Sequence, residues 1–207
     1  MSRGTFIALE GGEGAGKSTQ ARLLIEHLKS AHPTLEVVMS REPGGTKAAE
    51  ALRNVVLNPE FDGLSPRAEA LAFAAARGDH AAHVIRPGLE RGALVLLDRY
   101  LDSSVVYQGI ARGLGEDEVE HLSLWATENL QPDLVIVIDV DPQTAMSRFT
   151  ERDRLENEPL EFHQRVRQGF LDRAKSHPER FVVIDGTREA SAVSRDVIAA
   201  VEKVLAS

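Results

Sequence analysis

The sequence has no cysteine, which excludes disulfide bonds, a thiol nucleophile and thiolate metal ligands. Positive charge is also scarce, since 24 Lys and Arg stand against 32 Asp and Glu and the net charge is −8. This balance argues against broad electrostatic binding to nucleic acid or to an anionic membrane. We therefore expect neither nucleic acid nor a membrane among the partners of this chain.

Long hydrophobic runs are missing as well. The longest run, Ala70 to Ala76, is far shorter than the ~20 residues that span a bilayer, and the apolar stretch Phe6 to Leu9 is too short for a signal peptide. We therefore expect a cytoplasmic protein. Apolar residues make up 43% of the chain and charged residues 27%, which is ordinary for a globular protein. No repeat or Pro/Gly-rich linker divides the sequence, so residues 1–207 are predicted to form one domain.

Five short β-rich runs are each followed by helix-like sequence. Apolar runs such as Leu134 to Ile138 lack polar alternation, which is typical of strands covered on both faces. Strands that alternate with helices indicate an α/β fold with a doubly wound, five-stranded parallel sheet flanked by helices. The predicted strands are Thr5–Glu10, Glu36–Ser40, Leu94–Asp98, Leu134–Asp139 and Phe181–Asp185. The predicted helices are Lys17–Ala31, Glu50–Leu57, Pro66–Arg77, Ala81–Arg91, Asp102–Gly109, Glu116–Asn129, Pro142–Arg152, Leu160–Ser176 and Ala190–Leu205.

The strongest motif is a glycine-rich segment between the first strand and the first helix. Its sequence, Gly11-Gly12-Glu13-Gly14-Ala15-Gly16-Lys17-Ser18, matches G-x-x-x-x-G-K-[ST] in the right context. Glycines let backbone N–H groups turn toward a phosphate, and the helix N-terminus adds partial positive charge. We expect Lys17 to reach the terminal phosphates, Ser18 to ligate Mg²⁺ and Thr19 to contact the α-phosphate. The motif predicts binding of a nucleoside triphosphate.

The sequence also indicates which kind of phosphate-loop protein this is. A GTPase switch would carry N-K-x-D and a D-x-x-G after a strand, and neither string occurs. The chain length suits a shikimate-type or other small-metabolite kinase. The identity of the phosphoryl acceptor therefore has to be inferred from the remaining residues.

Two polar segments follow predicted strands, where the carboxyl edge of a parallel sheet builds active sites. Asp98-Arg99-Tyr100 ends the third strand, and there Asp98 could hold Mg²⁺ or its water while Arg99 binds phosphate oxygens in pairs. A helix-capping Asp beside a surface Arg is the structural alternative. Arg41-Glu42-Pro43-Gly44-Gly45-Thr46 follows the second strand, and an ordinary strand-to-helix turn explains it almost as well.

Two helical faces have the composition of a nucleobase pocket. Arg77 lies four residues after Phe73, and Tyr107 and Gln108 lie three and four residues after Ser104, which places each set on one side of a helix. An aromatic ring can stack on a base, while Arg, hydroxyl and amide groups bond its edge. Taken singly, the two aromatic residues also suit a hydrophobic core.

These segments occur in an order that resembles the bacterial thymidylate kinase family along the whole chain. The Asp-Arg-Tyr step followed by Tyr107-Gln108-Gly109 is the most specific part of this resemblance. The resemblance implies a P-loop nucleoside monophosphate kinase that converts ATP and dTMP to ADP and dTDP with Mg²⁺, for dTTP biosynthesis. It also implies a homodimer, for which the apolar helix Leu64 to Ala76 could supply a buried face.

The resemblance further assigns roles in the acceptor site. Phe73 would stack on the thymine ring and Arg77 would bond its carbonyl edge. Ser104 and Gln108 would lie near the base or the sugar. Tyr107 would sit against the deoxyribose, at the place of a ribose 2′-hydroxyl.

Further roles implied by the resemblance concern phosphate and metal. Glu13 would approach the 3′-hydroxyl of the acceptor. Arg41 and Arg99 would surround the acceptor phosphate, and Pro43 would pack their loop. Ser18 and Asp98 would hold Mg²⁺, directly or through water. The acceptor phosphate is already an anionic nucleophile, so the protein needs no general base.

Some relatives carry an arginine inside the phosphate loop, where this chain has Glu13 and Ala15. Phosphoryl transfer requires positive charge that offsets the negative charge on the transferring group. We expect this positive charge in a mobile lid at residues 146–161. There, Arg152 or its neighbour Arg154 would close over the transferring phosphate and Arg148 would face ATP. The catalytic set is then Lys17, Arg99 and Arg152. These arginines alternate with acids, so a solvated surface is the alternative.

Two other functions stay open at this stage. One is a kinase for another nucleotide or a small metabolite, and the other is a nucleotide-dependent binding module with little transfer activity. The seven histidines do not cluster at metal-ligand spacing. His80 and His83 share one helix face, and we expect both at the surface.

Overall fold

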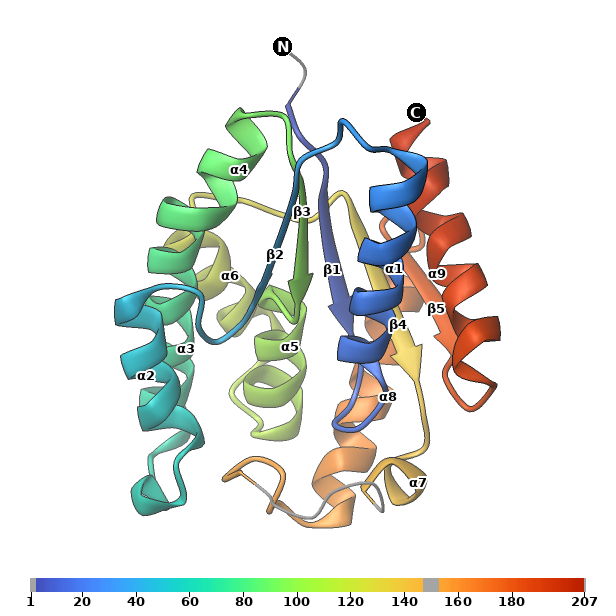
Figure 1. Cartoon of the computed structure of the whole chain (residues 1–207). Coiled ribbons are helices and arrows are strands. Elements are labelled where there is room, and N and C mark those ends of the chain that lie inside the picture. Colours follow the sequence, from blue (N-terminus) through green and yellow to red (C-terminus); the bar gives the residue numbers. More distant parts are fainter. Residues whose placement is uncertain (1–2, 147–152, 207) are drawn as a thin grey trace.

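The computed structural model of the chain describes residues 3–146 and 153–206. Five parallel strands form one sheet in the order β2-β3-β1-β4-β5 (Figure 1). This confirms the α/β class and the number of strands predicted from the sequence, and it adds the strand order. The strands are β1 (Phe6–Glu10), β2 (Val37–Arg41), β3 (Leu94–Asp98), β4 (Leu134–Asp139) and β5 (Phe181–Asp185).

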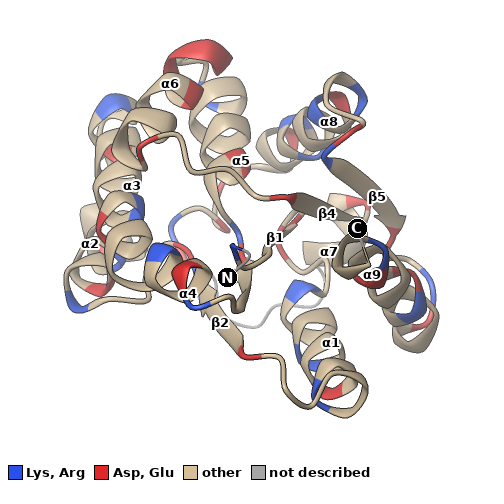
Figure 2. Ribbon diagram, turned by 90° about the horizontal axis from the view of Figure 1, so that it is seen from above, with Lys and Arg blue, Asp and Glu red and all other residues tan. Residues whose placement is uncertain are grey.

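Side chains of β1 show why its sequence is apolar without alternation. Ile7 and Leu9 pack with residues of α1 (Lys17–Ala31) and α9 (Ala190–Leu205). Phe6 and Ala8 point to the opposite face and pack in another cluster. Successive side chains alternate between faces, so a strand covered by helices on both sides has to be apolar throughout. Figure 2 shows α1 and α9 on one side of the sheet and the remaining long helices on the other.

Most predicted helices are confirmed, with ends that the caps explain. Helix α2 starts at Lys47 rather than Glu50, because the Thr46 side-chain oxygen accepts a hydrogen bond from the Ala49 N–H at 3.1 Å. Helix α6 ends before Asn129, which has a left-handed φ of 60°. The long helices on the face of the sheet opposite α1 and α9 are α2 (Lys47–Leu57), α3 (Pro66–His80), α6 (Glu116–Ala126) and α8 (Leu160–Ser176).

Two predicted helices turn out to be composite. Residues Ala81–Ile85 form a π-helical turn that leads into α4 (Arg86–Glu90). Likewise α5 (Leu101–Ser104) continues as a π-helical segment, Val105–Ala111. A wider turn of this kind often lies at a functional site. The helix predicted over Pro142–Arg152 is described only as α7 (Pro142–Met146), and its remainder lies outside the described residues.

A buried ion-pair network ties α8 to α5. Arg173 donates to the Asp102 carboxylate at 2.6 and 2.9 Å, and Arg180 donates to its other oxygen at 3.1 Å. Asp102 is fully buried and Arg173 nearly so. Buried charges are tolerated when they are paired and hydrogen-bonded, and this pair fixes the segment that follows β3.

Among the described helices, none has both the length and the apolar composition needed to cross a membrane.

Candidate active site

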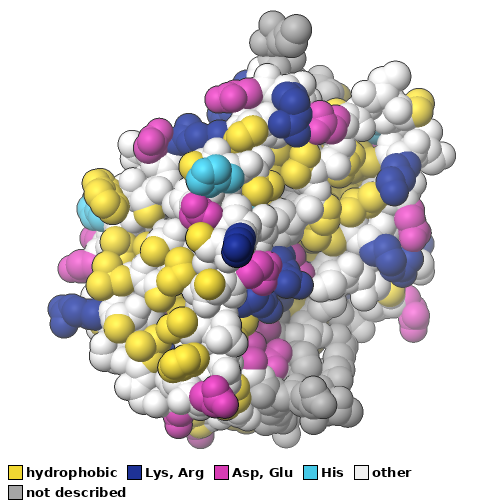
Figure 3. All heavy atoms as spheres, turned by 60° about the vertical axis from the view of Figure 1, so that its left-hand side comes forward, with side chains coloured by type: hydrophobic (Ala, Val, Ile, Leu, Met, Phe, Trp, Pro, Cys, Tyr) yellow, Lys and Arg dark blue, Asp and Glu magenta, His cyan; other side chains and the backbone are white. Residues whose placement is uncertain are grey.

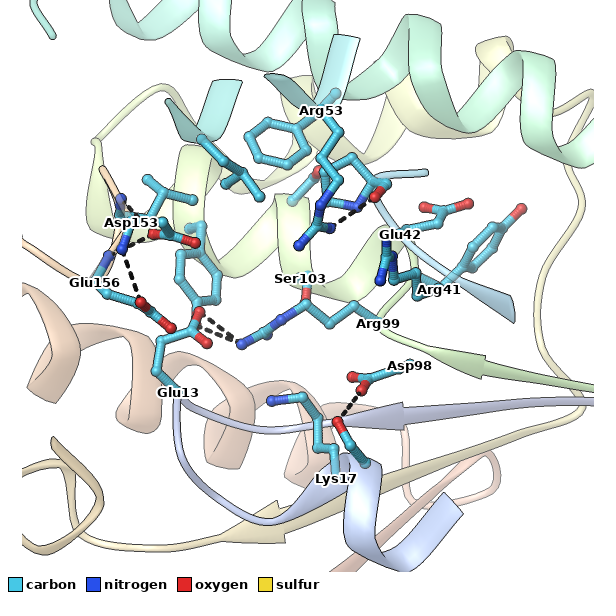
Figure 4. Close-up of a pocket in the computed structure, with 18 of the residues that line it drawn as sticks. Glu13, Lys17, Arg41, Glu42, Arg53, Asp98, Arg99, Ser103, Asp153 and Glu156 are labelled. Carbon is cyan, nitrogen blue, oxygen red and sulfur yellow. Dashed lines mark hydrogen bonds and ion pairs between the residues drawn. The ribbon is translucent and has the colours of Figure 1, made fainter. Parts of the chain in front are cut away.

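A cavity of about 580 Å³ opens at the carboxyl edge of the sheet (Figure 4). Its walls come from the phosphate loop, the loop after β2, helices α2 and α3, the end of β3, and the α5 segment. Residues far apart in sequence meet here because parallel strands all end at the same edge. Predicted residues that line it are Glu13, Gly14, Gly16, Lys17, Ser18, Thr19, Arg41, Pro43, Phe73, Arg77, Asp98, Arg99, Ser104, Tyr107 and Gln108.

The phosphate loop has the tight geometry that its glycines permit. Gly11 has φ 133°, and a Cβ there would lie 2.4 Å from the Ile138 carbonyl oxygen, so a larger residue cannot fit. Gly11, Gly12 and Ala15 shape the loop without lining the cavity, and Ala15 is buried. Helix α1 starts directly after the loop and presents its N-terminus to the cavity.

Lys17 and Ser18 lie at the start of α1 and face the end of β3. The Lys17 ammonium donates to the carbonyl oxygens of Gly11 and Gly12 at 3.2 and 2.9 Å. Burial lowers the pKa of Lys17, although the nearby Glu13 and Asp98 carboxylates act in the opposite direction. Ser18 Oγ donates to Asp98 Oδ2 at 2.9 Å. The predicted approach of Asp98 to the phosphate loop is therefore confirmed, and two oxygen donors lie beside the lysine.

Arg99 joins the phosphate loop to the α5 segment. It adopts a left-handed φ of 70°, which is uncommon for a residue with a side chain. Its guanidinium lies 2.7 Å from Glu13 Oε1 and donates to the Tyr107 hydroxyl at 3.2 Å. Another N–H donates to the Gly11 carbonyl oxygen at 3.0 Å. Arg99 is thus paired within the cavity, so the surface position of the structural alternative is wrong for this residue.

The Glu13 carboxylate points toward Arg99, across the cavity from its own loop (Figure 4). Its Oε1 also accepts a hydrogen bond from the Tyr107 hydroxyl at 2.9 Å. Burial alone would raise the pKa of Glu13, but the charges of Arg99 and Lys17 and the bond from Tyr107 outweigh burial and lower the pKa to about 2. A carboxylate inside an anion-binding loop is therefore compensated by the guanidinium of Arg99, the residue that follows β3.

Glu10, the last residue of β1, supports the same turn and was missed from the sequence. Its carboxylate accepts hydrogen bonds from the Tyr100 N–H at 2.8 Å and from the Ser103 N–H and hydroxyl at 3.1 and 2.6 Å. Burial raises the pKa of Glu10 to about 7 despite the Arg99 charge nearby. An acid at the end of an otherwise apolar strand is the signal that could have identified it.

The predicted base pocket lies at the other end of the cavity. Phe73 and Tyr107 belong to a buried hydrophobic cluster, which confirms the core alternative, and both side chains also line the cavity. Arg77 is 2% exposed and donates to Ser104 Oγ at 2.9 Å and to Ser123 Oγ at 3.1 Å. Gln108 donates to the buried Glu69 carboxylate at 2.9 Å, which orients its amide.

The loop after β2 is part of the wall, with a cis peptide bond between Glu42 and Pro43. Arg41 is largely exposed and pairs with Glu50 at 3.4 Å. Arg53, which sequence reasoning missed, reaches from α2 and donates to the Pro43 carbonyl oxygen at 2.8 Å. The remaining lining residues received no individual role from the sequence; they are Glu42, Leu57, Tyr100, Ser103, Asp153, Leu155 and Glu156.

The structure corrects two expectations about surface residues. Arg154 is not a free lid cation, because it is buried, bonds the Glu69 carboxylate and donates to the Val56 carbonyl oxygen at 2.8 Å. His80 is not at the surface either, since it is fully buried and contacts Glu42 at 3.1 Å. The acidic partner is remote in sequence, so helix spacing could not reveal it. His83 is exposed as expected, and its Nδ1 lies 3.2 Å from the Asp79 carboxylate.

The predicted lid at residues 146–161 is described only in part. Arg148 and Arg152 lie outside the described residues. In the described part, Leu155 is buried and Asp153 and Glu156 line the cavity, so this part is not the wholly solvated surface of the alternative. Burial raises the pKa values of both acids, and the nearby Glu13 charge adds to this.

A parallel sheet with a phosphate loop before α1 and an acid at the end of β3 defines the class of P-loop nucleotide-binding enzymes. The family model for thymidylate kinase matches residues 9–197. The chain is 47% identical to the thymidylate kinase of Clavibacter sepedonicus, over 99% of this chain and 97% of that protein. Identity to the thymidylate kinase of Symbiobacterium thermophilum is 46%, over 97% and 94% of the two chains.

A solved structure agrees with these sequence matches. The crystal structure of thymidylate kinase from Ehrlichia chaffeensis superimposes with a TM-score of 0.81 at 34% identity, over 96% of this chain and 99% of that one. The chain therefore belongs to the thymidylate kinase family and is a nucleoside monophosphate kinase.

The Glu13–Arg99 pair makes stability depend on pH. Because the pKa of Glu13 is lowered in the folded state, its contribution is complete above the unfolded value of 4.5 and is lost as pH falls toward 2. Glu13→Gln should lower the free energy of unfolding by about 3 kcal/mol at pH 7, and by about half of that at pH 3. Urea unfolding at both pH values measures this. Glu26→Gln, at an exposed pair with Arg22, is the control with little effect; a Glu13→Gln effect independent of pH would contradict the assignment.

Proposed function

We propose that this chain transfers the γ-phosphoryl group of ATP to dTMP and releases ADP and dTDP, as a step in dTTP biosynthesis. The observation that carries this proposal is the single cavity that joins the phosphate loop to the pocket of Phe73 and Arg77. One ligand can therefore hold its phosphates at α1 while a second presents a base between α3 and α5. Family membership supports dTMP as that second ligand.

On the donor side, the residues present suit a Mg²⁺–ATP complex. Ser18 Oγ and the Asp98 carboxylate are the oxygen donors that Mg²⁺ prefers, and they already contact each other. When bound, Mg²⁺ would neutralise phosphate charge. Among the described residues, the Lys17 ammonium bonds only carbonyl oxygens of its own loop, so it can turn to phosphate oxygens without breaking an ion pair to any of them.

On the acceptor side, Arg99 and Arg41 are the phosphate ligands we propose. Arg99 holds Glu13 and Tyr107, the two groups proposed to lie at the acceptor sugar. Its guanidinium therefore orients sugar contacts and phosphate together, which places two reactants in line. The acceptor phosphate attacks without a general base, and the residues named here only bind, orient and offset charge.

In the base pocket, Phe73 would stack on thymine while Arg77 donates to a ring carbonyl. Arg77 can only donate, so it favours an acceptor at that edge of the base. Ser104 Oγ accepts one of its N–H groups and Gln108 is held by Glu69, so both stay in place beside the base or the sugar. Tyr107 is held between Glu13 and Arg99, where it would exclude a 2′-hydroxyl.

ADP release with Mg²⁺–ATP should be much faster with dTMP than with dUMP, ribo-TMP, AMP, GMP, CMP or shikimate. Among these acceptors, dTMP and dUMP combine a carbonyl edge for Arg77 with a sugar that clears Tyr107, and of the two dTMP alone adds a 5-methyl group, whose burial in the pocket favours it over dUMP. A coupled assay across this panel measures it. Preference for another acceptor would refute the pocket assignment and keep the phosphate-loop chemistry. ATP binding without turnover of any acceptor would indicate a binding module instead.

We propose further that Arg152 supplies positive charge to the transferring phosphate and that Arg148 contacts ATP. This rests on the loop composition, in which Glu13 and Ala15 leave Lys17 as the sole cation. Arg152→Ala should lower kcat by roughly 10³-fold. Steady-state kinetics measures this, with Arg195→Ala on the exposed face of α9 as the control. A change of only a few-fold would remove Arg152 from the mechanism.

Finally, we propose a cytoplasmic homodimer. Leu71 on α3 is 57% exposed and Trp125 on α6 is 83% exposed, and these two helices pack against each other. Figure 3 shows hydrophobic side chains gathered over α2 and α3. Sedimentation should give twice the mass of one chain, and Leu71→Glu should shift it toward the monomer. Val183→Glu, on the edge strand β5, is the control that should stay dimeric; a monomeric wild type would refute the proposal.

A further inference from the structure

His80, which the mechanism above does not use, lies at the end of α3 in a buried chain of polar groups. Its Nε2 lies 2.8 Å from Ser40 Oγ, and its Nδ1 lies 3.1 Å from Glu42 Oε1. The other Glu42 oxygen accepts from Arg77 Nε at 2.7 Å. His80, Glu42 and Arg77 have exposed side-chain fractions of 0%, 3% and 2%. The chain therefore runs without a gap from β2 to a residue of the cavity wall.

Hydrogen-bond chemistry gives this chain a direction. The Glu42 carboxylate can only accept, so His80 Nδ1 carries the proton that it shares with Glu42. In the neutral ring, Nε2 then accepts the hydroxyl proton of Ser40. The imidazole is thus fixed at both nitrogens, and a fixed imidazole holds the carboxylate that orients the Arg77 guanidinium.

Packing fixes the ring as well. A Cβ at Gly45 would lie 2.5 Å from both Cδ2 and Nε2 of His80, so the loop backbone runs directly against the imidazole. Beside it, the Thr46 hydroxyl bonds the carboxylate of Asp79. The end of α3 therefore packs against and hydrogen-bonds the loop that carries Glu42 and Pro43, both of which line the cavity. His80 itself is absent from the cavity lining.

We propose that His80 is a positioning residue for the acceptor site, acting through Glu42 to hold Arg77 in the orientation that reads the base. This inference rests on the proposed function and deepens it, because it places the origin of base specificity outside the cavity. The Arg77 guanidinium donates four hydrogen bonds, and these fix its orientation. The acceptors are Glu42, Ser123, the Tyr100 carbonyl oxygen and Ser104. Glu42 is the only charged one among them.

The direct test replaces His80 by Phe, which fills similar space without either hydrogen bond. We expect KM for dTMP to rise about tenfold, which corresponds to about 1.4 kcal/mol of coupling between His80 and Arg77, with kcat and KM for ATP nearly unchanged. Preference for dTMP over 5-methyl-dCMP, whose 4-amino group donates instead of accepting, should fall by a similar factor. The control is His83→Phe, three residues further along and exposed, which should match the wild type.

Two conservative variants separate positioning from packing. An Asn amide at position 80 can take the place of Nδ1 and donate to Glu42, whereas a Gln amide reaches the place of Nε2 and Ser40. His80→Asn should therefore restore most of the dTMP affinity and His80→Gln should not. This comparison decides the matter even where His80→Phe fails to fold. Equal effects of Asn and Gln, or a parallel loss of kcat and both KM values, would overturn the proposal.

A double-mutant cycle tests the route through Arg77. In an Arg77→Ala background, His80→Asn and His80→Gln should no longer differ in KM for dTMP; an undiminished difference would overturn the proposal. The wild-type control in each assay tests the proposed function separately. Should the wild type prefer another acceptor, the dTMP assignment fails, and the same KM comparison on that acceptor still decides the role of His80.

Discussion

The pairing of Glu13 with Arg99 is the interaction on which the rest of the site depends. It joins the loop after β1 to the turn after β3 at 2.7 Å, across the carboxyl edge of the sheet. The left-handed backbone of Arg99 costs conformational energy, which is offset by the bonds from Tyr100 and Ser103 to Glu10 and by the pair itself. The phosphate loop and the α5 segment are therefore held together by contacts within the protein itself.

Charge compensation extends this arrangement through the cavity wall. Glu13 and Arg99, Glu42 and Arg77, and Glu69 and Arg154 are three buried or half-buried pairs, and each links different elements. Buried ion pairs contribute little net stability but are costly to break, so they specify one relative placement of the elements. Arg173 with Asp102 does the same for α5 and α8. The cavity keeps its shape because each of these partners would be left as an unpaired charge if the wall moved.

Much of the fold followed from local sequence. The apolar runs of β1, β3 and β4 and the phosphate-loop motif carry their signals within ten residues, so the strands and the first helix were placed to within a residue. The π-helical turns were not foreseen, because their composition resembles an ordinary helix. Arg53, Glu10 and Glu42 were missed because their roles come from contacts with the loop after β2, the α5 segment and α3.

By itself, the sequence determined the α/β class, the phosphate loop and many of the residues that line the cavity, because these depend on periodicity and on short-range spacing. Only the tertiary structure decided the strand order, the pairing of Glu13 with Arg99, and the burial of His80 and Arg154. A histidine and a charged arginine read as surface residues until their partners are known, and Glu42 and Glu69 lie tens of residues away. Burying a polar group costs free energy unless a partner bonds it, and only the fold brings the two partners together.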